Sequence, residues 1–117
     1  MPGLTDDETD RLFHALATAT RRDILRRTLQ DEQSVSALAA KYDMSFAAVQ
    51  KHVAVLEAAH LIIKRAEGRE RLVRADPTMI ARARALLSRF EDLWRHRIDR
   101  LDAVLADPTH PTSTTGE

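Results

Sequence analysis

The chain has 117 residues, with 18 Lys and Arg balanced by 18 Asp and Glu, and it contains no cysteine. This length suits one domain with its own core, and the zero net charge argues against indiscriminate coating of nucleic acid. The lack of cysteine excludes disulfides, thiolate metal sites and thiol catalysis, and no run approaches the roughly 18 apolar residues of a membrane span.

The first helix is predicted from a capping box. Thr5 and Glu8 have the spacing at which each side chain bonds the other residue's backbone amide. Leu12, Phe13 and Leu16 then form an apolar stripe. The preceding residues 1–3 lead directly into acidic positions, unlike a signal peptide, so we expect a cytoplasmic protein without membrane association.

A second helix is predicted to begin at Thr20 and to bury Ile24, Leu25 and Leu29. Four arginines on it either contact DNA phosphates or form an ordinary solvated face, and the solvated face is favoured: Arg21, Arg22, Arg26 and Arg27. A polar connection, 30–33, follows.

Residues 34–62 have the pattern of a helix-turn-helix, with two short helices around a tight turn. Asp43 belongs to the few residue types that tolerate a left-handed turn conformation, and Ser45 is a strong N-cap for the second helix. The inner faces are predicted to carry Leu38, Ala39, Val49, Val53 and Leu56.

The opposite face of the second helix carries Phe46, Ala47, Gln50, Lys51 and Ala54. Gln50 can pair bidentately with an adenine edge, Lys51 can reach a phosphate or a guanine, and Ala47 is small enough to meet a thymine methyl. Because a plain helical hairpin has the same periodicity, the flanking segments decide between the two interpretations.

Two β-prone segments, 61–65 and 71–75, flank a loop at 66–70 in which Gly68 supplies a permissive backbone. This pattern predicts a hairpin, which is the wing of a winged helix-turn-helix domain. Its apolar face would pack on the helices, because an isolated hairpin is marginally stable.

Positive charge gathers around this region. From 41 to 74 there are seven Lys or Arg against four acids, whereas the rest of the chain carries the balancing acidic excess. One surface is therefore suited to phosphate. We expect the wing to direct Arg69 and Arg71 toward a neighbouring groove, with simple solvation as the alternative.

The last helix is predicted from Pro77, capped by Asp76 or Thr78, to Ala106. At ~1.5 Å per residue it is about 45 Å long, which exceeds what a protomer of this size covers. Its stripe contains Ile80, Ala83, Leu87, Phe90, Trp94, Ile98, Leu101 and Leu105.

We therefore expect a homodimer with a two-fold interface built from the first and last helices. Trp94 and Phe90 are alternatively the lining of a small-molecule pocket, but aromatic residues on a helical stripe are more often interface. In this interpretation 1–106 is one DNA-binding and dimerisation domain and 107–117 is a flexible tail. The predicted interface comprises Leu12, Phe13, Leu16, Phe90, Trp94, Ile98, Leu101 and Leu105.

Four segments together resemble the ArsR-type winged helix-turn-helix repressors, over a region from 12 to 76. They are the opening 15–25, the recognition helix 45–52, its exit 56–61 and the wing 67–69. The resemblance implies a mainly α fold with a small β-hairpin wing. Together with the residue chemistry it gives the predicted DNA-binding set: Ser45, Phe46, Ala47, Gln50, Lys51, His52, Lys64, Arg69 and Arg71.

The chain departs from the family pattern at two positions. Gln50 stands where serine is usual, which leaves the target sequence open, and His60 stands where glycine is usual. The segment 44–52 and Trp94 resemble the branch of the family that lacks thiolate sensors.

Catalysis finds little support, because the five histidines are scattered and no phosphate loop or nucleophile setting occurs. Asp92, His96 and Asp99 share one helical face, as metal ligands would, but ordinary ion pairing is favoured. We therefore predict no enzyme activity, no cofactor and no metal.

The predicted function is a homodimeric repressor that binds a pseudo-palindromic operator in double-stranded DNA. The alternatives are a winged-helix protein-interaction module and a metal- or small-molecule-responsive repressor. No residue identifies a signal that releases DNA.

Overall fold

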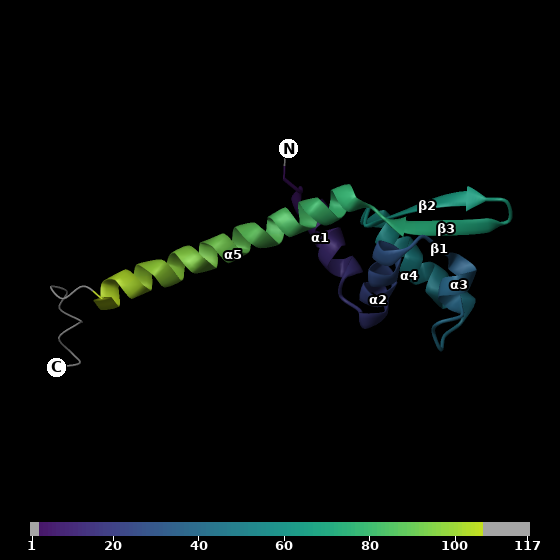
Figure 1. Ribbon diagram of the computed structural model, residues 1–117, viewed down its shortest axis with the longest axis horizontal. Coiled ribbons are helices and arrows are strands. Elements are labelled where there is room, and N and C mark those ends of the chain that lie inside the picture. The colour runs from purple at the N-terminus through teal and green to yellow at the C-terminus, as the bar shows by residue number, and fades with distance from the viewer. Residues whose placement is uncertain (1–2, 107–117) are drawn as a thin grey trace. The chain divides into compact units, whose positions relative to one another are not determined.

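A computed structural model describes residues 3–106, so the predicted tail 107–117 lies outside the described residues. The chain divides into two compact units, Met1–Ala83 and Arg84–Glu117, and each is treated by itself. The described elements (Figure 1) are α1 (Asp6–Ala15), α2 (Ala19–Gln30), β1 (Gln33–Ser34), α3 (Val35–Ala39), α4 (Phe46–Ala58), β2 (Ile62–Glu67), β3 (Glu70–Ala75) and α5 (Pro77–Ala106).

Side-chain caps fix where the helices begin. Thr5 Oγ1 accepts from Glu8 N at 3.1 Å and Glu8 Oε1 accepts from Thr5 N at 2.8 Å, which confirms the predicted capping box. Ser45 Oγ accepts from Ala48 N at 3.1 Å, and Asp76 Oδ1 accepts from Thr78 N at 3.0 Å. Each cap satisfies an amide that has no partner inside its own helix.

The predicted helix-turn-helix is present as α3 and α4. The core of the first unit gathers the inner faces of its helices and one face of its sheet. Its most deeply buried large side chains are Leu12, Ile24, Leu38, Val49, Val53, Leu56, Leu61 and Val73. Burial of this set stabilises the unit by roughly 1.5 to 3 kcal/mol per side chain.

The sheet has three strands in the order β1-β3-β2 within the described part of the chain. The sequence predicts a connecting loop at Gln33, but this residue pairs with Val73 and belongs to the strand β1, so that prediction is wrong. The hairpin β2–β3 is the predicted wing, but its turn is shorter than predicted because Glu67 already pairs with Glu70. The remaining turn contains Gly68, whose φ of 60° suits glycine.

Two predictions about α2 are wrong. The helix is capped by Thr18, whose Oγ1 accepts from Arg21 N at 3.2 Å, and not by Thr20. Leu29 is 54% exposed, whereas Thr28 is buried in the place expected for an apolar residue. Thr28 tolerates burial because its hydroxyl donates to carbonyls of its own helix, including that of Ile24 at 3.0 Å.

The left-handed residue lies at the end of α4 and not in the turn before it. Asp43 has no positive φ, while His60 has a φ of 61°. His60 N donates to Glu57 O at 2.9 Å and Leu61 N donates to Leu56 O at 3.0 Å, the pattern of a Schellman cap. This geometry explains why glycine is usual at position 60.

Candidate nucleic-acid interface

One face of α4 is free and the opposite face holds the helix in the core. Val49, Val53 and Leu56 are at most 1% exposed. The other side is exposed along the helix and consists of Phe46, Ala47, Gln50, Lys51 and Ala54. This strip combines the long amide of Gln50, the positive charge of Lys51 and the small side chains of two alanines. Such a combination is suited to a helix that contacts base edges in the major groove.

Ser45 and His52 differ from the other predicted DNA-binding residues of this helix. The Ser45 hydroxyl is engaged in capping Ala48 N. His52 is partly buried, and its Nδ1 lies 3.1 Å from Nη1 of Arg21. Burial, and after it the positive charge of Arg21, lowers the pKa of His52. His52 therefore lies between the open strip and the interior.

Arg21 was expected on a phosphate-binding or solvated face, and both alternatives are wrong. It is 7% exposed. Its Nε donates to Ala15 O at 2.9 Å and its Nη2 donates to His14 O at 2.8 Å, both at the C-terminal end of α1. Both carbonyls lie in the last turn of α1, where the helix itself supplies no i+4 amide, and the His14 carbonyl also accepts from Ala17 N at 3.2 Å. The buried guanidinium is therefore well satisfied.

A second polar network ties α2 to the turn that precedes α4. The carboxylate of Asp23 accepts from Tyr42 Oη at 2.5 Å and from Arg27 Nε at 2.8 Å, and it also pairs with Arg26. The Tyr42 hydrogen bond contributes most to holding the pKa of Asp23 well below its usual range. Burial and the same bond raise the pKa of Tyr42 to about 12. The cluster holds the turn of the helix-turn-helix.

The wing brings three predicted residues into the same unit as α4. Lys64 Nζ lies 3.3 Å from Glu57 Oε1, which links the hairpin to α4. Arg71 lies opposite Ala66, on the sheet face that also holds Lys64 and buried Val73. Arg69 is exposed in the turn. Arg69 and Arg71 thus form the open basic part of the wing.

Arg65 has a different role, although it sits in the same strand as Lys64. Its Nε and Nη2 donate to the two carboxylate oxygens of Glu32 at 3.0 and 2.8 Å. A further ion pair joins it to Glu67 at 3.3 Å. This bidentate pair links the wing to the segment before β1. The positive charge of Arg65, which the sequence alone counts among the basic residues available to DNA, is therefore already paired within the protein.

The predicted dimer-interface residues fall in both units. In the first unit, Phe13 is 46% exposed and Leu16 is partly exposed, but Leu12 is 1% exposed. The assignment of Leu12 to the interface is therefore wrong, because its side chain is buried in the core and cannot contact a second copy.

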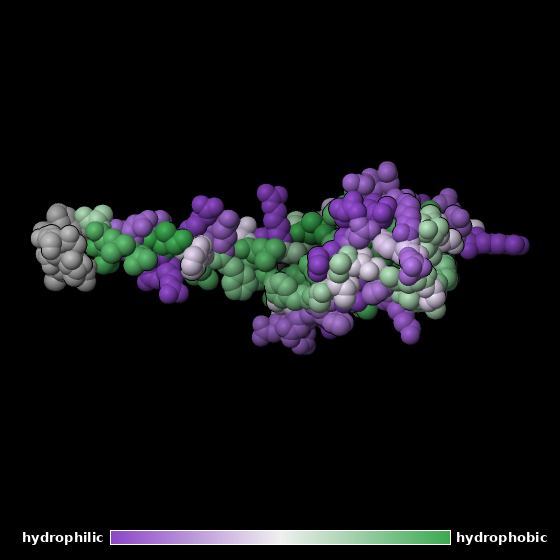
Figure 2. All heavy atoms as spheres, turned by 90° about the horizontal axis from the view of Figure 1, so that it is seen from below, coloured by the Kyte–Doolittle hydropathy of each residue, from purple (hydrophilic) through white to green (hydrophobic). Residues whose placement is uncertain are grey.

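In the second unit the apolar residues of α5 from Leu87 onward are open, whereas Leu86 is buried. Figure 2 shows hydrophobic patches alternating with hydrophilic ones along this helix. Trp94 is 59% exposed, and the other predicted residues range from 37% for Ile98 to 60% for Leu105. Leu87 and Leu93, at 54% and 68%, extend the same surface.

Asp92, His96 and Asp99 are all exposed on α5. Within residues 3–106 no three His, Asp or Glu side chains come together in a manner that would hold a metal ion. Across the same residues, none of the helices is both long and apolar enough to cross a membrane.

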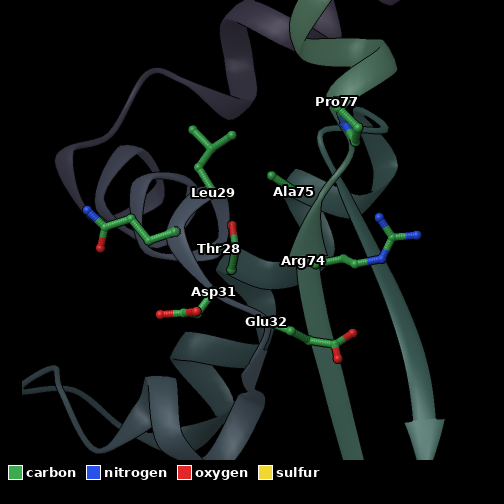
Figure 3. A pocket seen from close by; sticks show the side chains of 8 residues that line it. Thr28, Leu29, Asp31, Glu32, Arg74, Ala75 and Pro77 are labelled. Atoms are coloured by element: carbon green, nitrogen blue, oxygen red, sulfur yellow. The ribbon is translucent and has the colours of Figure 1, made fainter.

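A surface pocket of about 330 Å³ lies in the first unit between the end of α2 and the junction of β3 with α5. Its lining mixes exposed Leu29 with the acidic Asp31 and Glu32. Figure 3 shows the Arg74 side chain extending away from Leu29. None of the predicted site residues lines it.

An open helix face, a pinned helix-turn-helix and a basic hairpin define a winged helix-turn-helix domain of the DNA-binding class. Comparison with known proteins supports this assignment to the winged helix-turn-helix class. The chain is 40% identical to the HTH-type transcriptional regulator Rv2034 of Mycobacterium tuberculosis over 81 residues, which are 69% of this chain and 76% of that protein. None of the protein-family models matches.

Solved structures place the fold in the same group. An ArsR-like transcriptional regulator from Rhodococcus sp. RHA1 superposes with a TM-score of 0.75 at 30% identity, covering 84% of this chain and 90% of that one. The homodimeric winged helix-turn-helix DNA-binding domain of Mb0332 from Mycobacterium bovis has a TM-score of 0.61 at 28% identity, covering 79% and 91%. The chain belongs to the ArsR family of winged helix-turn-helix transcriptional regulators.

Proposed function

We propose that this regulator is a homodimeric repressor that binds a pseudo-palindromic operator in double-stranded DNA and blocks polymerase at the promoter. Residues 1–106 act as one DNA-binding and dimerisation domain. The protein works in the cytoplasm and catalyses no reaction, and the described residues give no reason to assign it a metal or a small-molecule effector.

The observation that carries the proposal is the open strip of α4. Because Val49, Val53 and Leu56 occupy the core, the helix presents Gln50 and Lys51 to solvent. In the proposed complex Gln50 pairs with an adenine edge and Lys51 contacts a phosphate or a guanine. Ala47 and Ala54 allow the helix to approach the groove closely, and Phe46 packs against thymine methyls.

The wing adds contacts outside the major groove. Arg69 and Arg71 are exposed and bind phosphates or the adjoining minor groove. Lys64 must first break its ion pair with Glu57, so we expect it to contribute less to DNA affinity than the two arginines. His52 contributes mainly through its position beside Arg21.

Two independent observations support a dimer. One protomer carries one recognition helix, whereas operators of this class are read by two helices about one DNA turn, roughly 34 Å, apart. The open apolar surface of α5 also needs a cover of matching chemistry, and a second copy supplies it. The Mb0332 domain is itself homodimeric. The interface proposed for this chain comprises Phe13, Leu16, Phe90, Trp94, Ile98, Leu101 and Leu105.

The decisive experiment is a mobility shift with the DNA that lies upstream of the protein's own gene. A shuffled duplex of the same length and composition is the matched control, and sedimentation at the same protein concentrations gives the oligomeric state. We expect a dimer whose shift of the upstream DNA survives excess shuffled competitor. Equal affinity for both duplexes would overturn the proposal.

A protein-interaction module is the second candidate, and exposed Phe46 favours it because a large aromatic residue at the start of α4 also suits a protein partner. The two candidates separate in the same assay. A module of this kind would dimerise in the centrifuge and show no preference for the upstream DNA.

A further inference from the structure

Arg21 and His52 join two elements that the proposed function uses for different purposes. Arg21 holds the C-terminal end of α1 through the carbonyls of His14 and Ala15. Its remaining nitrogen, Nη1, lies 3.1 Å from Nδ1 of His52 on α4. The guanidinium is thus a single bridge from a helix of the proposed dimer interface to the recognition helix.

The chemistry of this bridge fixes the state of the histidine. Arginine only donates hydrogen bonds, so Nδ1 of His52 must accept, and the ring is neutral with its proton on Nε2. A second proton on His52 removes the acceptor and sets two cations side by side. The carboxylate of Asp23 on α2 is engaged by Tyr42, Arg26 and Arg27, and the carboxylate of Glu57 on α4 is paired with Lys64 of β2, so neither is free to pair with a protonated His52.

We propose that Arg21 and His52 are positioning residues that fix the rotation of α4 about its axis, and that protonation of His52 releases this constraint and lowers selective DNA binding. The inference rests on the proposed function. The apolar stripe of α4 sets its depth in the core, but apolar contacts are non-directional. The stripe selects which face of α4 is turned outward, and the directional bond at its edge fixes the exact rotation of that face, so the aim of Gln50 within the open strip depends on it.

The proposal reverses the usual effect of acid on DNA binding. Adding positive charge to a protein ordinarily strengthens its attraction to phosphate, for every sequence alike. Release of α4 instead misplaces the base-reading side chain, so cognate affinity falls while affinity for random DNA does not. The low pKa of His52 places this change below about pH 6.5, the ordinary value for histidine.

Two substitutions of similar polarity test the bond. His52→Asn keeps an oxygen near the position of Nδ1 and cannot titrate, whereas His52→Gln carries its oxygen near the position of Nε2. We expect His52→Asn to bind the upstream DNA within about threefold of the wild type at pH 7.5. We expect His52→Gln to lose about tenfold, the size of one hydrogen bond to a charged group, with shuffled DNA bound as before.

The pH profile provides the second measurement. As the pH falls from about 7.5 through the lowered pKa of His52, the ratio of upstream to shuffled affinity should fall toward a loss of about tenfold for the wild type, while His52→Asn stays within about twofold. Arg21→Lys keeps the charge but loses the three-way bridge, and it should behave like His52→Gln. Thermal unfolding of each variant separates misplacement of α4 from loss of the fold.

The outcomes are distinct. If the wild type shows no preference for the upstream DNA, the proposed function fails and this inference with it. If the wild type prefers that DNA but folded His52→Gln binds it normally, or His52→Asn keeps the full pH dependence, the inference alone is overturned.

Discussion

The two units of this chain use their apolar residues in opposite ways. In the first unit most large apolar side chains of α1 to α4 and of the sheet are buried, with Leu38, Val49 and Leu56 at 0% exposure. The exposed exceptions are Phe13, Leu29, Phe46 and Ile63. In the second, Phe90, Leu93 and Trp94 are more than half exposed. The first unit therefore has a core of its own, whereas the second presents the open apolar surface on which the proposed dimer interface is built.

Polar groups show the same contrast. The first unit has networks that cross between elements, such as Asp23 with Tyr42 and Arg65 with Glu32. In the second, the ion pair found among the described residues joins Arg95 to Glu91 one turn apart on the same helix. Exposed pairs of that kind contribute only about 0.3 to 0.5 kcal/mol. In the proposed dimer, the second copy would supply from outside the contacts that this unit lacks.

The largest expected effect removes that outside contribution. Trp94→Glu places a charge in the centre of the proposed interface, and we expect the dimer to weaken by about 3 kcal/mol or more, with helix content nearly unchanged. Sedimentation equilibrium measures the change. His96→Glu, on the opposite side of α5, is the control and should stay dimeric. A monomeric wild type, or a dimeric Trp94→Glu, would contradict the interface.

The next effect tests the first unit. Leu38→Ala leaves a cavity at a fully buried site, so we expect a loss of about 3 kcal/mol in the free energy of unfolding. Leu101→Ala makes the same chemical change at a 57% exposed site. In the monomeric Trp94→Glu background it should alter urea unfolding by less than about 0.5 kcal/mol. Similar losses at both positions would end the distinction between the units.

A smaller effect concerns the polar network under the turn. Asp23→Asn removes the charge that accepts from Tyr42 and two arginines, and we expect a cost of about 2 kcal/mol. Because the folded pKa of Asp23 is depressed, its contribution is present above about pH 4, the ordinary value, and is lost as pH falls further. The free energy of unfolding, measured between pH 3 and 7, should therefore change more steeply with pH for the wild type than for Asp23→Asn. Exposed Asp43→Asn in the same turn is the control.

Local signals made much of this fold predictable. The capping boxes, N-caps and helical periodicities act within four residues, so Thr5, Ser45 and the whole extent of Pro77–Ala106 were predicted correctly. The misses depend on contacts between distant segments. The strand at Gln33 exists because β3 offers an edge 40 positions later, and nothing near Gln33 encodes that edge.

The site divides in the same way. Exposure of Gln50 follows from the stripe opposite it, but burial of Arg21 follows from its hydrogen bonds to carbonyls at the end of another helix. Leu12 was separable from Phe13 only through the packing of the first unit. For His60 a signal was present, because a position where glycine is usual implies a left-handed residue.

Base reading is the next test of the first unit. Gln50→Ala should lower affinity for the upstream DNA by about 1.5 kcal/mol and leave shuffled DNA unaffected, because the lost contact is to a base. The control is Ala54→Ser, a small change at an exposed position one turn along the same strip, and it should alter the affinity for either DNA much less than Gln50→Ala alters the affinity for upstream DNA. Mobility shifts on both duplexes measure the difference, and equal losses on both would remove Gln50 from the base-reading role.

The smallest effect separates the wing arginines. Arg69 is exposed in the turn, whereas Arg65 is held by Glu32 and Glu67. We expect Arg69→Ala to weaken binding to upstream and shuffled DNA equally, by less than about 1 kcal/mol, and to reduce the salt slope by about 1. Arg65→Ala should leave the slope unchanged, because its charge is already neutralised within the protein. Titrations at several salt concentrations decide the matter: a reduced slope for Arg65→Ala, or an unchanged one for Arg69→Ala, would mean that the wing meets DNA through its strand and not through its turn.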